Sequence, residues 1–237
     1  MIELEVRNLA GSEVLHAYPK AAATSALPCI VFYHGFTSSK VVYSYFAVAL
    51  AQAGFRVIMP DALDHGSRFE GDAAQRLQRF WPILLNSIEA FPALRDAIIS
   101  QGWLADERLA VAGASMGGMT ALAIVTHHPE VKCVASLMGT GYFSSLSRTL
   151  FPSPEFPQTL HQWDVGRHLE TLATRPLFLW HGEEDDVVPA IESFRLQQAL
   201  KQQGLDKNLT SQWQAGVKHR ITPEALEAAV SFFQQHL

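Results

Sequence analysis

The chain has 237 residues, 48% of them hydrophobic, so it can bury a sizeable core as one α/β domain spanning residues 1–237. Lys and Arg number 18 and Asp and Glu number 23, which gives a formal net charge of −5 without a basic run. The sequence therefore gives no reason to expect a nucleic acid partner, and no apolar run approaches the roughly 18 residues that span a bilayer, so we expect no membrane partner.

The start of the chain and the cysteines bear on localisation. The first nineteen residues are charged and alternating, and they lack the apolar region of a signal peptide. Cys29 and Cys133 each lie inside an apolar run, which predicts buried, reduced thiols. We therefore expect a cytoplasmic protein.

The strands of the predicted sheet are visible as short patterns. The first eighteen residues alternate between polar and apolar positions around Gly11, which predicts an antiparallel hairpin. Unbroken apolar runs follow at 29–33, 55–59, 108–113, 131–139 and 176–182. Runs that are apolar on both faces are typical of parallel strands with helices on each side.

Helical patterns separate these runs. Residues 42–53 keep helical spacing up to a stop at Gly54. The stretch 72–101 is helical in character but contains Pro82 and Pro92, so we expect it to be kinked or split. Alternating strands and helices predict a mostly parallel α/β sheet with right-handed crossovers and helices on both faces.

A glycine-rich turn carries the first candidate for chemistry. Residues 113–117, GASMG, fit the pattern G-x-S-x-G between a predicted strand and a predicted helix. So tight a turn needs small neighbours, and it would present Ser115 at the edge of the sheet with the Met116 amide at the start of a helix. The alternative interpretation is a Gly- and Ala-rich helix entry with an incidental serine.

A catalytic serine needs a base and an acid, and the chain offers both. The hydroxyl must lose its proton to a base, usually a histidine oriented by a carboxylate. On a sheet of this kind the acid and then the histidine follow late strands. Four acids, Glu183 to Asp186, follow the run that ends at Gly182, and His219 stands just before the last predicted helix, with Thr222 as its N-cap.

These motifs together resemble those of the α/β-hydrolases. The chain has GASMG, HGEEDDVVP and GVKHRI where that superfamily carries its serine, acid and histidine motifs, and the similarity covers essentially the whole chain. It is most similar to bacterial YjfP-type carboxylesterases, through VFYHGFTSSKVVYSYFAVALAQAG and RVIMPDALDHGSRF. The resemblance implies an α/β-hydrolase fold and hydrolysis of small esters without a cofactor. The HG-to-VP spacing selects Asp185 as the acid, with Asp186 as its rival.

The oxyanion of a tetrahedral intermediate needs at least two hydrogen-bond donors. The Met116 amide is one candidate, and the second should come from the loop after the first central strand. Gly35 would allow that backbone to approach closely, and the Phe36 amide is the candidate donor. His34 in this loop, and Asp64 and His65 in the next one, are expected to brace loops rather than to transfer protons.

Other side chains are expected to serve the structure. No spacing typical of a metal site is present, so no metal is expected. His127 and His128 are expected to interact with carbonyl groups at the end of the helix that follows Ser115. His181, at a strand end, is expected to be structural.

The least regular part of the chain lies between residues 139 and 176. Residues 141–163 carry many aromatic residues among prolines and serines, and they could form a small cap over the site. The alternative is a surface loop whose aromatic side chains pack on the core. The end of this part, 164–174, is expected to be a helix that covers the sheet. The expected substrate-binding residues are Phe36, Met116, Tyr142, Phe143 and Trp163.

Together these features predict a serine carboxylesterase that cleaves esters of short-chain acyl groups through an acyl-enzyme, with Ser115, Asp185 and His219 as catalytic residues. A thioesterase or a small peptidase could use the same triad. A non-catalytic binding protein on a hydrolase fold is a further alternative. The oligomeric state stays open.

Overall fold

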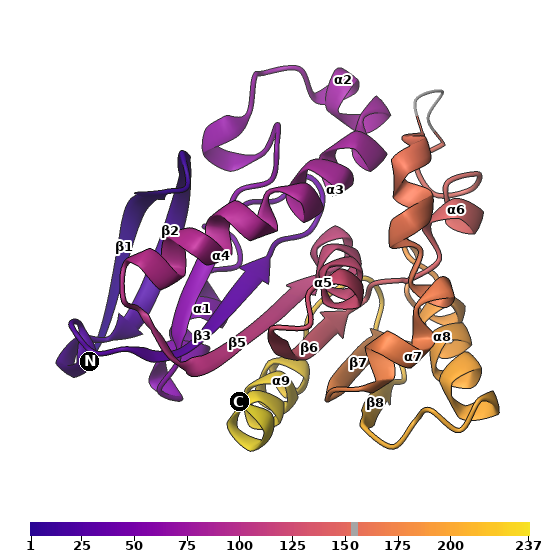
Figure 1. Ribbon diagram of the computed structural model, residues 1–237. Coiled ribbons are helices and arrows are strands. Elements are labelled where there is room, and N and C mark those ends of the chain that lie inside the picture. The colour runs from indigo at the N-terminus through magenta and orange to yellow at the C-terminus, as the bar shows by residue number, and fades with distance from the viewer. Residues whose placement is uncertain (153–155) are drawn as a thin grey trace.

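The computed structural model describes residues 1–152 and 156–237 and contains one eight-stranded sheet (Figure 1). The strand order is β1-β2-β4-β3-β5-β6-β7-β8, with parallel pairing from β4 through β8 and antiparallel pairing of β1 with β2 and of β2 with β4. The strands are β1 (Ile2–Leu9), β2 (Ser12–Pro19), β3 (Leu27–Tyr33), β4 (Arg56–Pro60), β5 (Leu104–Ala114), β6 (Val131–Leu137), β7 (Leu177–Gly182) and β8 (Leu209–Gln214). The expected parallel sheet and N-terminal hairpin are confirmed.

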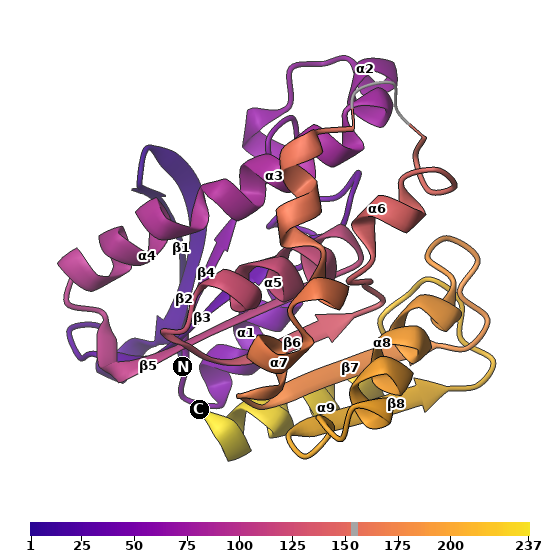
Figure 2. The ribbon, with the colours of Figure 1, turned by 45° about the vertical axis from the view of Figure 1, so that its right-hand side comes forward.

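Helices cover both faces of this sheet, as expected. The helices α1 (Ser44–Gln52) and α9 (Pro223–His236) contribute to one buried apolar cluster. The helices on the other face, which are in front in Figure 2, are α3 (Phe80–Glu89), α4 (Phe91–Ser100), α5 (Met116–His127), α7 (Leu169–Ala173) and α8 (Ala190–Gln202). Two short helices, α2 (Ala73–Gln78) and α6 (Phe143–Leu146), lie apart from the sheet in the upper part of both views.

The prolines of the stretch 72–101 divide it into three helices. Breaks fall at Arg79 and Ala90, so Pro82 lies at the third position of α3 and Pro92 at the second position of α4. The first four amides of a helix have no partner inside it, so a proline costs no hydrogen bond there. The expected split is confirmed.

The helix expected over 164–174 is confirmed only in its later part, where α7 spans Leu169–Ala173. The earlier part forms the 3₁₀ turn η4 (Val165–Arg167), which follows another 3₁₀ turn, η3 (Gln158–Trp163). Asp164 does not begin a helix because its carboxylate accepts the Ser144 amide, at 3.2 Å, and the Ser144 hydroxyl. This contact ties η4 to α6 and holds the chain in a turn.

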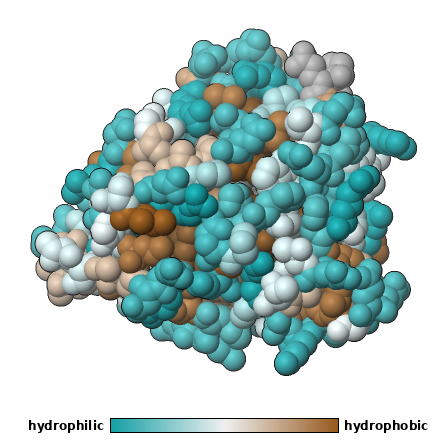
Figure 3. Space-filling view, viewed as in Figure 1, coloured by the Kyte–Doolittle hydropathy of each residue, from teal (hydrophilic) through white to brown (hydrophobic). Residues whose placement is uncertain are grey.

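The surface in Figure 3 is mixed. Hydrophilic residues predominate on this face, and the apolar groups are small and separated, one of them near the end of α4. Among the helices of the described ranges, none has both the length and the apolar character needed to cross a membrane.

Candidate active site

Ser115 lies in the turn that joins β5 to α5. Its backbone has φ 56° and ψ −119°, a positive φ that non-glycine residues seldom adopt. Strain of this kind costs about 1–3 kcal/mol and is found most often at functional sites. The residue is only 7% exposed.

The glycines around Ser115 are required by close backbone approaches. A β-carbon on Gly117 would overlap the carbonyl oxygen of Tyr33, at the end of β3. One on Gly113 would overlap the backbone of Gly117. A β-carbon on Gly35 would lie 3.5 Å from that of Ser115, so the loop after β3 passes directly against the serine.

Three side chains from distant parts of the chain form a continuous hydrogen-bonded relay. The His219 Nε2 atom lies 3.0 Å from the Ser115 Oγ atom. The Nδ1 atom of the same ring lies 2.8 Å from the Asp185 Oδ2 atom. Asp186, the rival acid, instead points to solvent and pairs with Lys218 at 3.1 Å.

The carboxylate of Asp185 is fully buried and receives four hydrogen bonds. The amides of Val187 and Val188 donate to Oδ1, each at 2.9 Å. Oδ2 accepts from His219 and from the buried His181, whose Nε2 atom lies 3.0 Å away. Burial opposes ionisation, but the bonds from His181, His219 and Val187 outweigh it and hold the pKa of Asp185 well below its usual range. Asp185 is therefore a fixed negative charge beside His219.

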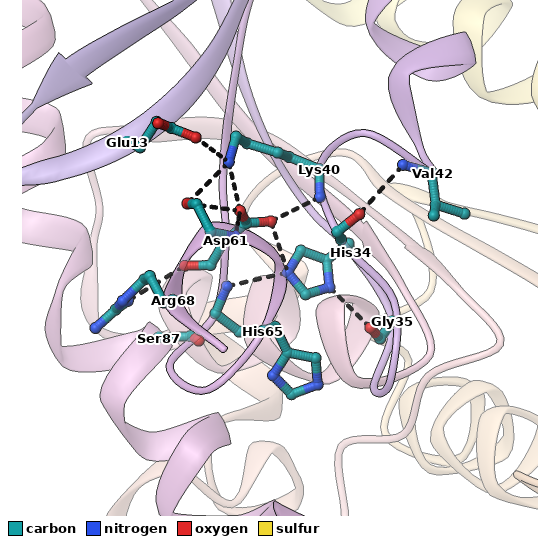
Figure 4. A network of polar contacts seen from close by, with 12 residues as sticks. Glu13, His34, Gly35, Lys40, Val42, Asp61, His65, Arg68 and Ser87 are labelled. Atoms are coloured by element: carbon teal, nitrogen blue, oxygen red, sulfur yellow. Dashed lines mark hydrogen bonds and ion pairs between the residues drawn. The ribbon is translucent and has the colours of Figure 1, made fainter. Parts of the chain in front are cut away.

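The loop after β3 offers a second free amide close to Ser115. In the described part of the chain, neither the Phe36 amide nor the Met116 amide donates a hydrogen bond within the protein. His34 donates from Nδ1 to the Gly35 carbonyl at 2.8 Å, and its Nε2 atom accepts the Ala62 amide at 3.0 Å. His34 thus joins this loop to the loop after β4, as Figure 4 shows.

Beneath these loops lies a buried ion pair that the sequence analysis missed. Lys40 is 2% exposed, and its ammonium contacts the Asp61 carboxylate and, at 2.8 Å, Glu13 (Figure 4). Asp61 also accepts the Lys40 amide at 2.8 Å and the Ser67 amide at 2.9 Å. Although burial acts against it, these bonds lower the pKa of Asp61.

Comparisons with known proteins place this site in a family. The model of the prolyl oligopeptidase family matches residues 41–237, and that of platelet-activating factor acetylhydrolase, isoform II, matches residues 6–74. Esterase YjfP of Escherichia coli (strain K12) is 62% identical over the full length of both chains. The chain is an α/β-hydrolase of the prolyl oligopeptidase family. The resemblance to YjfP-type carboxylesterases is thereby confirmed.

One further relative and one solved structure are similar to this hydrolase over nearly its full length. The YitV protein of Bacillus subtilis (strain 168) is 30% identical over the full length of both chains. The crystal structure of TT1662 from Thermus thermophilus has a TM-score of 0.80 at 21% identity, covering 99% of this chain and 98% of that one, and it shows the shared fold.

Aromatic side chains of the hydrolase gather around Phe36. The Phe36 ring lies 4.9 Å from that of Phe80 and 5.0 Å from that of Phe151, measured between ring centroids. Phe151 stacks on Phe80 at 4.6 Å, and the Trp81 indole donates to the Phe151 carbonyl at 3.2 Å. Part of the segment 141–163 is thereby anchored on α3 beside the loop that carries Phe36.

The other aromatic residues expected to bind substrate have different partners. Phe143 is fully buried and packs near Trp81. The ring of Tyr142 lies under the Arg195 guanidinium at 4.0 Å. Trp163 packs on His127 at 4.2 Å, at the opposite end of α5 from Ser115. Twelve residues of helix separate those ends by about 18 Å, so the structure does not bring Trp163 to the serine.

Two histidines of the hydrolase have partners other than the expected helix carbonyls. His127 Nδ1 contacts the Thr126 hydroxyl at 2.7 Å, and His128 Nδ1 contacts the Glu130 carboxylate at 3.0 Å. A side-chain partner lies within reach of each ring, so the carbonyl contacts are not needed. Within residues 1–152 and 156–237, no group of three His, Cys, Asp or Glu residues has the arrangement of a metal site.

Proposed function

We propose that this ester hydrolase cleaves carboxylic esters of short-chain acyl groups, with Ser115 as nucleophile, His219 as general base and Asp185 as the carboxylate that orients His219. The observation that carries the proposal is the continuous relay from Ser115 Oγ through both nitrogens of His219 to Asp185. Its geometry lies within the range in which a base can take a serine proton.

Each half of the reaction uses the same proton path. Ser115 Oγ attacks the ester carbonyl while its proton passes to His219 Nε2, and the alcohol leaves with that proton. Water then attacks the acyl-enzyme, giving its proton to His219, and Ser115 leaves with the proton as the acid is released. Asp185 stays ionised and stabilises the imidazolium in both halves.

The amides of Phe36 and Met116 are proposed to stabilise the oxyanion in both tetrahedral intermediates. Neither amide has a partner among the described residues, and the two flank Ser115 in sequence or in space. The Met116 amide also lies at the N-terminus of α5, where the helix dipole favours negative charge. Preorganised donors of this kind are each worth about 10²–10³ in kcat.

The aromatic cluster supports a small acyl pocket. We propose that residues 141–163 form a small cap, of which 153–155 lie outside the described residues. Phe151 would close one side of the pocket by packing on Phe36 and Phe80. A buried methylene adds about 0.8 kcal/mol only while the pocket encloses it. We therefore expect kcat/KM to peak at acyl chains of roughly two to four carbons, a size taken from the resemblance to the family, and to fall before lipid length.

Cleavage of small peptides or amides is the second candidate, favoured by the match to the prolyl oligopeptidase family. The same residues would act on an amide, but a poorer leaving group requires better protonation by His219. A panel of p-nitrophenyl esters from acetate to palmitate, matched thioesters and peptide anilides separates these substrate classes.

Buried thiols support a cytoplasmic location as part of this proposal. Cys29 and Cys133 are free, and burial raises the pKa of each thiol to about 12. The proposed steps require no cofactor.

Ser115→Ala tests the proposal directly. Only a hydroxyl is removed, so the fold should survive while kcat on p-nitrophenyl butyrate falls by up to about 10⁶, because the nucleophile is lost. Ser100→Ala, on the exposed end of α4, is the control and should leave kcat unchanged. Activity of Ser115→Ala above about a tenth of wild type would refute the assignment of the nucleophile.

A further inference from the structure

Two loops meet beside Ser115, and two histidines, His34 and His65, connect them. We call residues 34–38, after β3, the oxyanion loop, and residues 61–69, after β4, the bracing loop. His65 of the bracing loop is fully buried. Its Nε2 atom accepts the Thr37 amide of the oxyanion loop at 2.9 Å, and its Nδ1 atom lies 2.8 Å from the Leu63 carbonyl oxygen.

These partners fix the protonation of the His65 ring. A backbone amide can only donate and a carbonyl oxygen can only accept, so Nε2 carries the lone pair and Nδ1 carries the proton. The ring must therefore be neutral to hold both loops. Burial lowers the pKa of His65, which favours this neutral form.

The oxyanion loop needs such an external partner at Thr37. Thr37 has φ 61°, a left-handed conformation that costs a β-branched residue energy. The Ser38 amide closes the turn by donating to Gly35 at 3.2 Å, and the Thr37 amide is committed to His65. The Phe36 amide, between Gly35 and Thr37, has no partner in the part of the chain that the structure describes, which leaves it available to substrate.

We propose that His65 is a positioning residue for oxyanion stabilisation. By holding the Thr37 amide, His65 fixes the peptide unit between Phe36 and Thr37, and so restrains the adjoining Gly35–Phe36 unit that carries the Phe36 amide. Its ring also packs on the Phe36 side chain, at 5.1 Å between centroids. The inference rests on the proposed function, because it assumes that the Phe36 amide binds the oxyanion.

His34 has a different part in this arrangement. It binds the Ala62 amide and the Gly35 carbonyl, so it holds the peptide unit of the Phe36 amide at its carbonyl end, whereas His65 holds the next unit along the chain. The two rings lie 5.3 Å apart (Figure 4), and neither donates to the other. The Thr37 amide depends on His65 alone among the described residues.

A pair of variants separates the two nitrogens of His65. Asn at position 65 can reproduce the donor to Leu63 but is too short to reach Thr37. Gln can present an amide oxygen near the former Nε2 position. We expect His65→Asn to lower kcat on p-nitrophenyl butyrate by roughly 10- to 100-fold with KM within about twofold, and His65→Gln to recover most of that loss.

A transition-state analogue tests the same atoms. A trifluoromethyl ketone forms a tetrahedral adduct with the serine, so its affinity should fall in His65→Asn by about the same factor as kcat. His16→Gln, a change of another buried neutral histidine in the N-terminal hairpin, is the control and should change neither quantity. Urea midpoints of all variants show whether the fold is intact.

Several results would overturn the proposal. Unchanged kcat and inhibitor affinity in a folded His65→Asn variant would do so, as would a rise in KM with kcat preserved. If His65→Asn does not fold, long-range ¹H–¹⁵N spectra of the wild type decide, because a proton on Nε2 of His65 excludes the Thr37 bond. An inactive Ser115→Ala variant beside fully active His65 variants would refute this inference alone. An active Ser115→Ala variant would refute the proposed function itself.

Discussion

Asp185 and its neighbour Asp186 have the same side chain but different hydrogen-bond partners and burial. Four donors converge on the buried Asp185 carboxylate, two of them imidazoles, whereas the exposed Asp186 pairs with an exposed lysine. His181, expected to be structural, thus touches the same oxygen as His219 and helps to keep Asp185 ionised. Two adjacent residues of the same type are thereby given different tasks.

This difference predicts the effects of two matched substitutions. Asp185→Asn should lower kcat by roughly 10⁴, because an amide that donates to His219 Nδ1 favours the wrong tautomer. Asp186→Asn removes only a solvent-exposed ion pair and should stay within a few-fold of wild type. Steady-state kinetics on p-nitrophenyl butyrate at neutral pH measure both. The reverse ranking would move the carboxylate of the relay by one residue.

Among the elements, the proposed cap, residues 141–163, leads to a prediction about substrate size. Phe151→Ala removes the ring that stacks on Phe80 and meets the edge of Phe36. We expect kcat/KM for butyrate to fall by about tenfold, as 1–2 kcal/mol of apolar contact is lost, and the preferred acyl chain to lengthen. Phe194→Ala, on the exposed side of α8, is the control. An acyl-chain profile that keeps its maximum and its height in Phe151→Ala would contradict the pocket assignment.

The elements also show what a sequence can predict. β3 through β7 are predictable because strands buried on both faces must be apolar throughout, and the breaks in 72–101 follow from the geometry of proline. The order of serine, acid and histidine follows from the fold, so the motifs in the sequence already single out Ser115, Asp185 and His219 as candidates. The strands, the helix breaks and the motifs each depend on residues close together in the sequence, so they can be recognised from the sequence alone.

Other features depend on contacts between distant segments and leave little local signal. Lys40 follows a run of hydroxyl side chains, Thr37 to Ser39, and would pass for a solvated side chain, yet it is buried because the loops after β3 and β4 close over it. Trp163 looks like a cap aromatic but packs on the far end of α5. The contact of Asp164 with Ser144, which ends the expected helix, likewise requires the folded arrangement.

For the whole molecule, buried neutral histidines predict how stability varies with pH. Burial lowers the pKa of His16, in the hairpin, and of His34, beside the site, to about 4. A histidine of the unfolded chain has a pKa of about 6.5, so it is protonated as the pH falls below that value, whereas these two rings of the folded protein stay neutral down to about pH 4. The unfolded state therefore binds more protons between these values, and stability falls as the pH falls through that window.

We expect the free energy of unfolding to decrease by roughly 1–2 kcal/mol per histidine from pH 7 to pH 5. The pKa values of Asp61 and Asp185 are lowered, so the stability that these acids contribute is lost only at more acidic pH. Urea denaturation at pH 7, 6 and 5 measures the slope, and His16→Gln should reduce it. A free energy of unfolding that stays constant or rises as the pH is lowered from 7 to 5 would contradict the neutral, buried state of both rings.

The central claim, that Ser115 is an activated nucleophile, has a direct measurement. A fluorophosphonate reacts only with a serine that a neighbouring base activates, and mass spectrometry locates the adduct after digestion. We predict one adduct per chain on the peptide that contains Ser115, formed in parallel with the loss of esterase activity and absent in Ser115→Ala. An adduct on another serine, or full ester turnover by a chain fully labelled at Ser115, would contradict the account.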